Sequence, residues 1–212
     1  MIANLRIIGG AWGGRRLIAP PGLDTRPMPD RIKQSLMDYL GQDFTGLRCA
    51  DICSGSGSVG LELASRGASE VHLIEAGRHA QPALAANLRT CGNPPHVRLH
   101  AKPFQAVLPA LRNLDLIFAD PPFPWFPADP QLDQLLALAG ASLGPKGRLV
   151  IRGERGQDLP PLPRSLRKEG TRFYGRSWVA IYVPVIITNS SQATVPQSTG
   201  IPGFASLPHP AE

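Results

Sequence analysis

Short apolar runs alternate with stretches of helical spacing through the middle of the chain. The runs that read as buried strands lie at 47–53, 70–75, 97–100, 114–120 and 147–152. Helices are expected between them, within 54–64, 82–88, 103–111 and 132–143. Because strands that alternate with helices pair in parallel through crossover connections, this order predicts a doubly wound α/β sheet.

Three further segments flank this core. Residues 5–18 place apolar residues on both sides of a glycine-rich turn, which predicts a β-hairpin with Trp12 at its tip. Within residues 30–40 apolar side chains recur every four positions, as in an amphipathic helix. Residues 171–174 and 177–183 flank a Gly-Arg turn and predict a terminal β-hairpin. An antiparallel strand is therefore expected beside the parallel ones.

The composition suits one globular domain with a basic surface. The chain has 212 residues, of which 42% are hydrophobic and 18% are charged. Its net charge is +6, and residues 145–176 alone carry nine Lys and Arg against three acids. The first 48 residues add seven bases against four acids. Basic charge near both ends of the folded part indicates a polyanionic partner.

Cysteine and histidine usage argues against metal and disulfide chemistry. The three cysteines form no C-x-x-C pair, which suits free thiols in a reducing cytoplasm. The five histidines show no ligand spacing, so no metal is expected. Residues 1–10 lack the pattern of a signal peptide, and no apolar run is long enough to span a membrane. We expect a cytoplasmic protein without membrane association, and a monomer.

A glycine-rich loop follows the first strand of the core. Gly55, Gly57 and Gly60 have the G-x-G-x-x-G spacing that permits a tight turn and close approach of a nucleotide cofactor. The same spacing also occurs in turns that are only structural. Glu75 ends the next strand, where a carboxylate can accept hydrogen bonds from both hydroxyls of a ribose. The combination favours a cofactor that contains a nucleoside.

Asp51 narrows the choice of cofactor. An acid directly before the loop would repel a pyrophosphate but attract an ammonium or sulfonium group. S-adenosylmethionine carries both of these cations. The residues expected to bind it are Asp51, Ser54, Gly55, Gly57, Gly60 and Glu75.

The fourth strand of the core ends in Asp120-Pro121-Pro122-Phe123. Proline fixes φ, removes a donor and keeps the preceding residue out of helical conformation. The motif therefore presents a carboxylate and backbone carbonyls as acceptors beside an aromatic face. One interpretation is a site for an amino group on a flat ring. The other is a strand that simply exits into a proline-rich loop.

The N-terminal segment carries a basic face. Arg6, Arg15 and Arg16 could contact phosphates, with Trp12 available to stack on a base. The alternative is a small edge hairpin whose arginines are only solvated. The sequence of the segment leaves both interpretations open.

Taken together, these residues resemble the RsmD-type enzymes, bacterial methyltransferases of guanine N2 in small-subunit ribosomal RNA. The resemblance runs from Arg6 to Val183. Its motifs include Arg6-Ile7-Ile8-Gly9-Gly10, Trp12, Gly14-Arg15-Arg16-Leu17, Arg26-Pro27, Asp51, Ser54-Gly55-Ser56-Gly57, Ser65-Arg66-Gly67-Ala68, Leu73-Ile74-Glu75, Asn87-Leu88 and Asp120-Pro121-Pro122-Phe123. Departures from the family's usual pattern lie at Met28-Pro29, Lys33-Gln34 and Ala76-Gly77.

The resemblance implies a fold, a cofactor and a substrate. The fold is the Rossmann-like class I methyltransferase fold, with a seven-stranded sheet whose last strand is antiparallel and an N-terminal β-hairpin extension. The cofactor is S-adenosylmethionine, and the partner is ribosomal RNA or the small ribosomal subunit. The residues implied in catalysis are Asp120, Pro121, Pro122 and Phe123, and those implied in RNA binding are Arg6, Trp12, Arg15, Arg16 and Arg26.

We accordingly expect three parts along the chain. Residues 1–28 form the N-terminal hairpin and connector, and residues 29–184 form the methyltransferase domain. Residues 185–212 contain no Lys or Arg and many Ser, Thr, Pro and Gly, so a disordered tail is expected there.

Other functions fit the same residues. An Asp-Pro-Pro-Phe motif also serves methyltransferases of DNA adenine and of protein glutamine. A noncatalytic RNA-binding assembly factor could retain the fold without turnover. We expect no DNA target-recognition domain in so short a chain, which argues against sequence-specific action on DNA.

Overall fold

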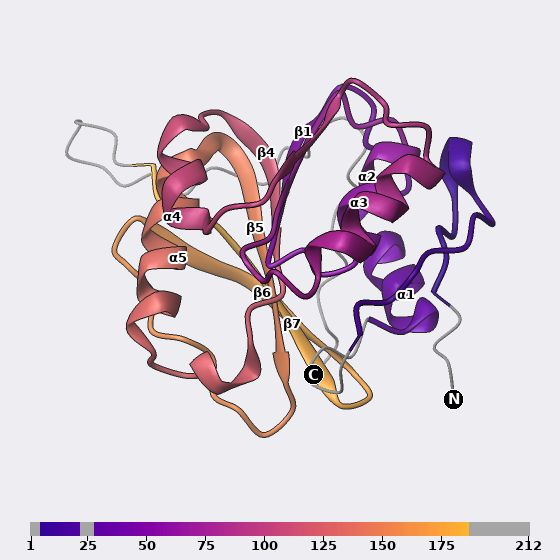
Figure 1. The fold of residues 1–212 in the computed structure, drawn as a ribbon. Coiled ribbons are helices and arrows are strands. Elements are labelled where there is room, and N and C mark those ends of the chain that lie inside the picture. Colours follow the sequence, from indigo (N-terminus) through magenta and orange to yellow (C-terminus); the bar gives the residue numbers. More distant parts are fainter. Residues whose placement is uncertain (1–4, 22–27, 187–212) are drawn as a thin grey trace.

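The computed structural model describes residues 5–21 and 28–186. A seven-stranded sheet in the order β3-β2-β1-β4-β5-β7-β6 forms its centre, with helices on both faces (Figure 1). The strands are β1 Arg48–Ile52, β2 Glu70–Ile74, β3 Val97–His100, β4 Leu114–Ala119, β5 Leu143–Glu154, β6 Leu166–Tyr174 and β7 Ser177–Pro184. The helices are α1 Asp30–Leu40, α2 Ser58–Ser65, α3 Gln81–Thr90, α4 Phe104–Val107 and α5 Pro130–Ser142.

The sheet is mixed, as the sequence predicts. Strands β1 to β5 pair in parallel, and β7 pairs antiparallel with both β5 and β6. The order of strands reverses between β1 and β4, which lie side by side at the centre. In open α/β sheets, ligands bind outside the carboxyl ends of the strands at such a switch point. The sheet topology therefore places the expected site at the ends of β1 and β4.

Three elements differ from the sequence expectation. The helix expected at 103–111 is divided into α4 and a 3₁₀ turn, Leu108–Ala110, with Pro109 in the turn. Strand β5 begins at Leu143, directly after α5. Strand β6 begins at Leu166, five residues before the expected 171. The sequence did not predict this first part, because most side chains of the strand are partly or fully exposed and give no apolar signal.

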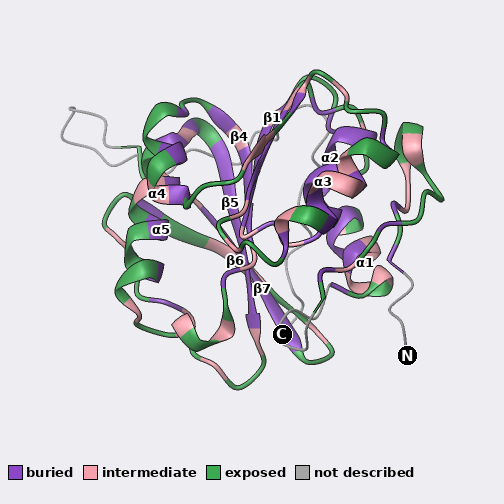
Figure 2. Ribbon diagram, viewed as in Figure 1, coloured by how far each residue is buried: buried purple, intermediate pink, exposed green. Residues whose placement is uncertain are grey.

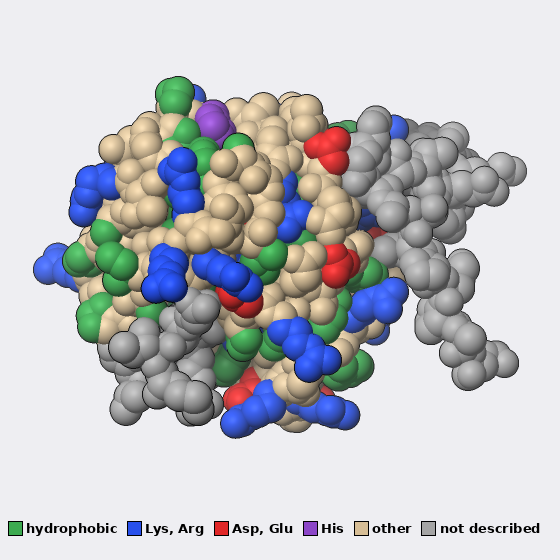
Figure 3. Space-filling model, turned by 90° about the vertical axis from the view of Figure 1, so that its right-hand side faces the viewer, with side chains coloured by type: hydrophobic (Ala, Val, Ile, Leu, Met, Phe, Trp, Pro, Cys, Tyr) green, Lys and Arg blue, Asp and Glu red, His purple; other side chains and the backbone are tan. Residues whose placement is uncertain are grey.

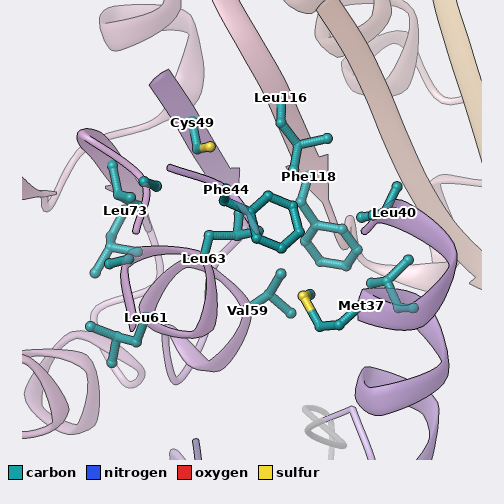
Figure 4. Close-up of a cluster of buried hydrophobic side chains, with 14 of the residues drawn as sticks. Met37, Leu40, Phe44, Cys49, Val59, Leu61, Leu63, Leu73, Leu116 and Phe118 are labelled. Carbon is teal, nitrogen blue, oxygen red and sulfur yellow. The ribbon is translucent and has the colours of Figure 1, made fainter. Parts of the chain in front are cut away.

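Two apolar layers fill the space on either side of the sheet (Figure 2). In one of them, side chains of α1 and α2 converge on Phe44 and Phe118 (Figure 4). The other layer packs α5 against β4, β5 and β7. Trp178 and Tyr182 are buried in it, which confirms that this strand contributes to the core. No helix in the described part of the chain is long and apolar enough to cross a bilayer.

The N-terminal segment pairs with itself more loosely than a regular hairpin. A single antiparallel bridge joins Arg6 to Arg16, with hydrogen bonds from the Ile7 amide to the Arg15 carbonyl (2.9 Å) and from the Leu17 amide to the Leu5 carbonyl (2.8 Å). A 3₁₀ turn, Gly10–Trp12, lies between the two arms. Glycines and the short 3₁₀ turn take the place of a two-residue hairpin turn.

A buried ion pair attaches this segment to the domain. The Glu62 carboxylate accepts hydrogen bonds from the amides of Ile8 (2.7 Å) and Gly9 (2.8 Å), and its Oε2 lies 3.3 Å from Lys33 Nζ. Both charged side chains are fully buried. Lys33 also donates to the Arg6 carbonyl at 2.6 Å. The segment is thereby fixed against α1 and α2 rather than projecting freely.

Candidate functional site

A cavity of about 820 Å³ opens at the carboxyl ends of β1, β2, β4 and β5. Its walls come from the segments 51–59, 74–80, 102–105 and 118–125. Arg152, Glu154, Met28 and the two prolines Pro20 and Pro21 close its sides. The glycine loop, Glu75 and the Asp-Pro-Pro-Phe motif, which are far apart in the sequence, therefore line one space.

The glycine loop takes the shape that its spacing predicts. Gly57 has φ of +74° at the start of α2, and a Cβ there would lie 2.4 Å from Leu84 Cδ1. A Cβ on Gly60 would lie 2.3 Å from Leu73 Cδ2. Gly55 also has positive φ, but a Cβ there would meet no atom within 4 Å. Gly57 and Gly60 are thus required for packing, whereas Gly55 keeps space free on the cavity side.

Two backbone amides from different loops hold the Glu75 carboxylate. Its two carboxylate oxygens accept hydrogen bonds from the amides of Gly55 (2.7 Å) and Gly77 (2.6 Å). A Cβ on Gly77 would lie 2.8 Å from Glu75 Oε1. The glycine at this position, a departure from the family pattern, therefore leaves room for the carboxylate. Each carboxylate oxygen retains a second lone pair for a hydroxyl group.

Asp51 is a buried acid without a cationic partner of its own. Its side chain is 1% exposed, and its Oδ2 accepts one hydrogen bond from the Gly60 amide at 2.8 Å. Burial, together with the neighbouring carboxylates of Asp120 and Glu75, raises the pKa of Asp51 to about 8, although the hydrogen bond from the Gly60 amide opposes the rise. A cation bound in the cavity would relieve this cost. The residue fits the positively charged end of a ligand.

Ser54 belongs to the loop between β1 and α2. It is buried and lines the cavity, and its amide donates to the Ile74 carbonyl at 3.2 Å. Four of the six residues expected at the cofactor site, Asp51, Ser54, Gly55 and Glu75, therefore line the cavity. Gly57 and Gly60 are not among the lining residues, but the Gly60 amide donates to Asp51, which is. The electrostatics and the open space at Gly55 fit a nucleoside that carries a cation.

Asp120 forms an ion pair with Arg152, a member of the basic cluster 145–176. Arg152 Nη1 lies 2.5 Å from Asp120 Oδ2, and its guanidinium lies 5.5 Å from the centre of the Phe123 ring. Burial raises the pKa of Asp120, and the charge and hydrogen bond of Arg152 oppose that rise. One guanidinium thus contacts both the acid and the aromatic of the motif.

The burial of two arginines corrects the expectation that the whole basic cluster 145–176 faces a polyanionic partner. Arg148 and Arg152 belong to the basic cluster 145–176, but both are buried in β5. Arg148 forms an ion pair with Glu169 at 2.9 Å, as Arg152 does with Asp120. Neither can lie on the phosphates of a bound nucleic acid. Arg148 and Arg152 are four residues apart in an apolar strand, and this even spacing is the signal that could have shown that they share a buried face.

The two prolines direct the chain across the cavity mouth. Pro121 is buried and Pro122 is exposed, and a 3₁₀ turn, Phe123–Trp125, follows them. The Phe123 carbonyl accepts a hydrogen bond from Gln157 Nε2 at 2.8 Å. Sequence reasoning missed Gln157, which has no motif around it. It fixes the loop that carries Phe123 to the loop after β5.

The aromatics after the motif have different environments. Trp125 lines the cavity and packs at 6.3 Å from the Phe104 ring. Phe126 contacts the edge of Trp178, with ring centres 5.2 Å apart. Phe126 therefore packs against the core, while Trp125 borders both the core and the cavity.

The basic residues of the N-terminal segment lie on the surface. Arg6, Arg15 and Arg16 are exposed, and the first two also contact Asp30 and the Thr90 carbonyl. The Trp12 ring is partly buried and stacks on His96, with centres 6.2 Å apart. Arg26 lies outside the described residues. Lys and Arg side chains gather on the lower part of the face shown in Figure 3, with few acidic side chains between them.

Comparisons with known proteins agree on one family. The family model described as "Conserved hypothetical protein 95" matches residues 5–183. "Ribosomal RNA small subunit methyltransferase D" of Escherichia coli (strain K12) is 39% identical over 122 residues, which cover 57% of this chain and 61% of that protein. "Putative rRNA methyltransferase YlbH" of Bacillus subtilis (strain 168) is 30% identical over 184 residues, covering 84% and 98%.

The fold shows the same relationship. The solved structure described as "Putative methyltransferase yhhF from Escherichia coli" superposes with a TM-score of 0.72 at 28% sequence identity. The match covers 85% of this chain and 97% of that one. The sequence match to the E. coli strain K12 relative spans less than two thirds of that relative's length.

Proposed function

The chain belongs to the family described as "Conserved hypothetical protein 95", and from this premise and the cavity we propose that it is an S-adenosylmethionine-dependent methyltransferase. Its substrate is the exocyclic N2 of a guanine in ribosomal RNA of the small subunit. The printed names of its relatives, ribosomal RNA methyltransferases among them, support this choice of substrate. Action on ribosomal RNA also implies a cytoplasmic location.

The observation that carries the proposal is the arrangement around Asp120. A carboxylate, the backbone of two prolines and an aromatic ring line the same cavity as a glycine loop and a buried acid. An amino group on a flat ring fits the first set, and a cationic nucleoside fits the second. The two ligands would meet within one cavity, as a methyl transfer between them requires.

Different residues would bind different chemical groups of the cofactor. Glu75 would accept hydrogen bonds from ribose hydroxyls, Asp51 would face the cationic end, and the loop from Ser54 to Gly60 would pack against the nucleoside. When bound, S-adenosylmethionine supplies an electrophilic methyl group. Every other requirement of the reaction falls on the residues of this chain.

Asp120 has two roles in the transfer. The guanine N2 lone pair is delocalised into the ring, so the free amine is a weak nucleophile. Asp120 and the Pro121 carbonyl would accept its N–H groups, and the negative charge of Asp120 favours the positive charge that develops on nitrogen. The Asp120 carboxylate can then accept the proton that the methylated nitrogen releases. Phe123 would stack on the base, a contact of about 1–3 kcal/mol.

Arg152 is a positioning residue in this scheme. Because it opposes the rise in the pKa of Asp120, Arg152→Met should leave the carboxyl protonated to higher pH. We expect the rate of methyl transfer to fall at neutral pH and to recover in part as the pH is raised. The ascending limb of the pH–rate profile should therefore move to higher pH. Single-turnover rates across a pH series would measure this.

The neighbouring Arg148→Met is the matched control for Arg152→Met. Arg148 is also a buried, ion-paired arginine of β5, but it is absent from the cavity wall. Its replacement should leave the midpoint of the limb in place. An unchanged midpoint in Arg152→Met as well would show that Arg152 does not control the ionisation of Asp120.

The raised pKa of Asp51 makes cofactor binding depend on pH. In the free protein the carboxyl, whose ordinary pKa is 3.8, stays protonated until about pH 8, whereas the unfolded chain loses this proton near 3.8; stability therefore falls as the pH rises from 3.8 and levels off above about 8. A bound cation restores the lost stability. The affinity for S-adenosylmethionine should therefore increase with pH up to about 8, by at most about tenfold per pH unit.

Calorimetric titration at about pH 6 and about pH 8 would measure the affinity of the wild type and of Asp51→Asn. The amide retains an acceptor for the Gly60 amide but cannot ionise. Titration of the cofactor's own amino group affects both proteins equally, so the difference between their profiles belongs to Asp51. Parallel profiles would exclude Asp51 as the partner of the cation.

One experiment tests the proposed function directly. Small subunits from a strain that lacks the gene are incubated with the purified protein and S-adenosylmethionine, and nucleosides of the digested RNA are separated by mass spectrometry. We expect a new N2-methylguanosine that Asp120→Asn does not produce. Methyladenine in DNA, methylglutamine in protein, or cofactor binding without any product would each support one of the alternative functions instead.

A further inference from the structure

The β6–β7 turn presents an aromatic side chain to solvent beside two arginines. Phe173 is 63% exposed, the largest exposed fraction among the large hydrophobic residues of the described chain. The Arg155 guanidinium lies 5.9 Å from the centre of its ring. Arg176, across the turn, has a side chain that is 81% exposed. An aromatic ring interleaved with arginines is the surface that binds single-stranded nucleic acid.

The sheet register places this cluster next to the cavity. Phe173 pairs with Trp178 of β7, which pairs in turn with Gly153 of β5. Adjacent strands lie about 4.8 Å apart, so the Phe173 backbone is about 10 Å from that of Gly153. Figure 1 shows the end of β5 and the β6–β7 turn at the same lower edge of the sheet.

Direct contacts connect the cluster to the cavity wall. Glu154, which lines the cavity, lies 3.3 Å from Arg176, and the Arg155 amide donates to the Arg176 carbonyl at 2.8 Å. Trp178, the neighbour of Phe173 on β7, touches Phe126 in the loop after the catalytic motif. A strand that leaves the cavity past Glu154 would next meet this turn.

We propose that Phe173, Arg155 and Arg176 form a binding site for a nucleotide that flanks the target base, with the base stacked on Phe173 and its phosphates near the two arginines. The proposal rests on the proposed function for the identity of the strand as RNA. Charge identifies the occupant, because the cluster carries two cations, Arg155 and Arg176, against one acid, Glu154, which forms an ion pair with Arg176. This excess of positive charge favours an anionic strand over a neutral apolar protein surface.

The test is the affinity of the whole protein for a fluorescently labelled single-stranded RNA oligonucleotide, measured by anisotropy. Phe173→Ala should weaken binding about tenfold, while Phe173→Trp should keep it close to that of the wild type. In methylation assays Phe173→Ala should raise KM for RNA and leave kcat unchanged. Affinity for S-adenosylmethionine should also stay the same. Val185→Ala, an exposed apolar residue at the opposite end of β7, is the matched control.

The dependence of RNA affinity on salt concentration tests the two arginines. The double change Arg155→Ala and Arg176→Ala should reduce the slope of log affinity against log salt by about 1.4, since each phosphate contact in a single strand contributes about 0.7. An unchanged slope would overturn the phosphate contacts. Equal losses in Phe173→Ala and Phe173→Trp would overturn stacking.

Failure of this inference differs from failure of the proposed function. If the wild type methylates ribosomal RNA and Phe173→Ala has the same KM and affinity, the flanking site is wrong and the function stands. If no RNA is methylated but Phe173→Ala still loses RNA binding that Phe173→Trp retains, the site stands and the function is wrong.

Discussion

Asp120→Asn should lower the rate of methyl transfer by about a thousandfold while leaving S-adenosylmethionine bound. The amide removes the negative charge that favours the cationic nitrogen. It also removes the group that would take the proton. In addition, an amide nitrogen in the Oδ2 position would lie 2.5 Å from the Arg152 guanidinium, so the side chain would turn its only acceptor toward Arg152. The side chain would then offer no acceptor to the base, and only the Pro121 carbonyl would remain.

The measurement is a single-turnover assay at saturating cofactor and RNA, with calorimetry to confirm cofactor binding. Asp133→Asn, the same exchange at an exposed position of α5, serves as the control and should keep the wild-type rate. A rate for Asp120→Asn within a few-fold of the control would remove Asp120 from the mechanism, and with it the proposed role of the motif.

Glu62→Ala should be the most destabilising of these changes, by about 3–5 kcal/mol. Glu62 accepts from the Ile8 and Gly9 amides and pairs with Lys33 and Arg66, at 3.3 and 2.8 Å. Its removal leaves a fully buried ammonium group, whose pKa burial already lowers, beside two backbone donors without a carboxylate. The N-terminal segment would lose its attachment at the same time.

Lys33→Met should cost less, because Glu62 would retain Arg66 and both backbone donors. Urea denaturation followed by circular dichroism would measure the free energy of unfolding, and limited proteolysis would report release of the segment. Arg6→Ala, which removes an exposed ion pair with Asp30 in the same segment, should cost less than about 1 kcal/mol. Equal losses in Glu62→Ala and Arg6→Ala would contradict the central role of the buried pair.

The amino-acid sequence by itself determined the local elements and the chemistry of the cavity. The strand expected at 114–120 is β4, which ends one residue earlier at Ala119, and the periodic stretch 30–40 is α1, with both ends as expected. The glycine spacing, the acid of Asp51 and the motif from Asp120 predicted a cofactor and an amine. These features are local: strand and helix patterns depend on neighbours within a few residues, and parallel strand ends meet at one edge by topology.

Only the tertiary structure decided which charges are paired and buried. Lys33 and Glu62, Asp120 and Arg152, and Phe123 and Gln157 lie about thirty residues apart in sequence, and no local pattern joins them. The basic cluster 145–176 indicated a polyanionic partner, whereas the structure pairs Arg152, one of its members, with the Asp120 carboxylate. Burial and pairing depend on which elements pack together, so the ionisation of Asp51 and Asp120 could be argued only from the folded chain.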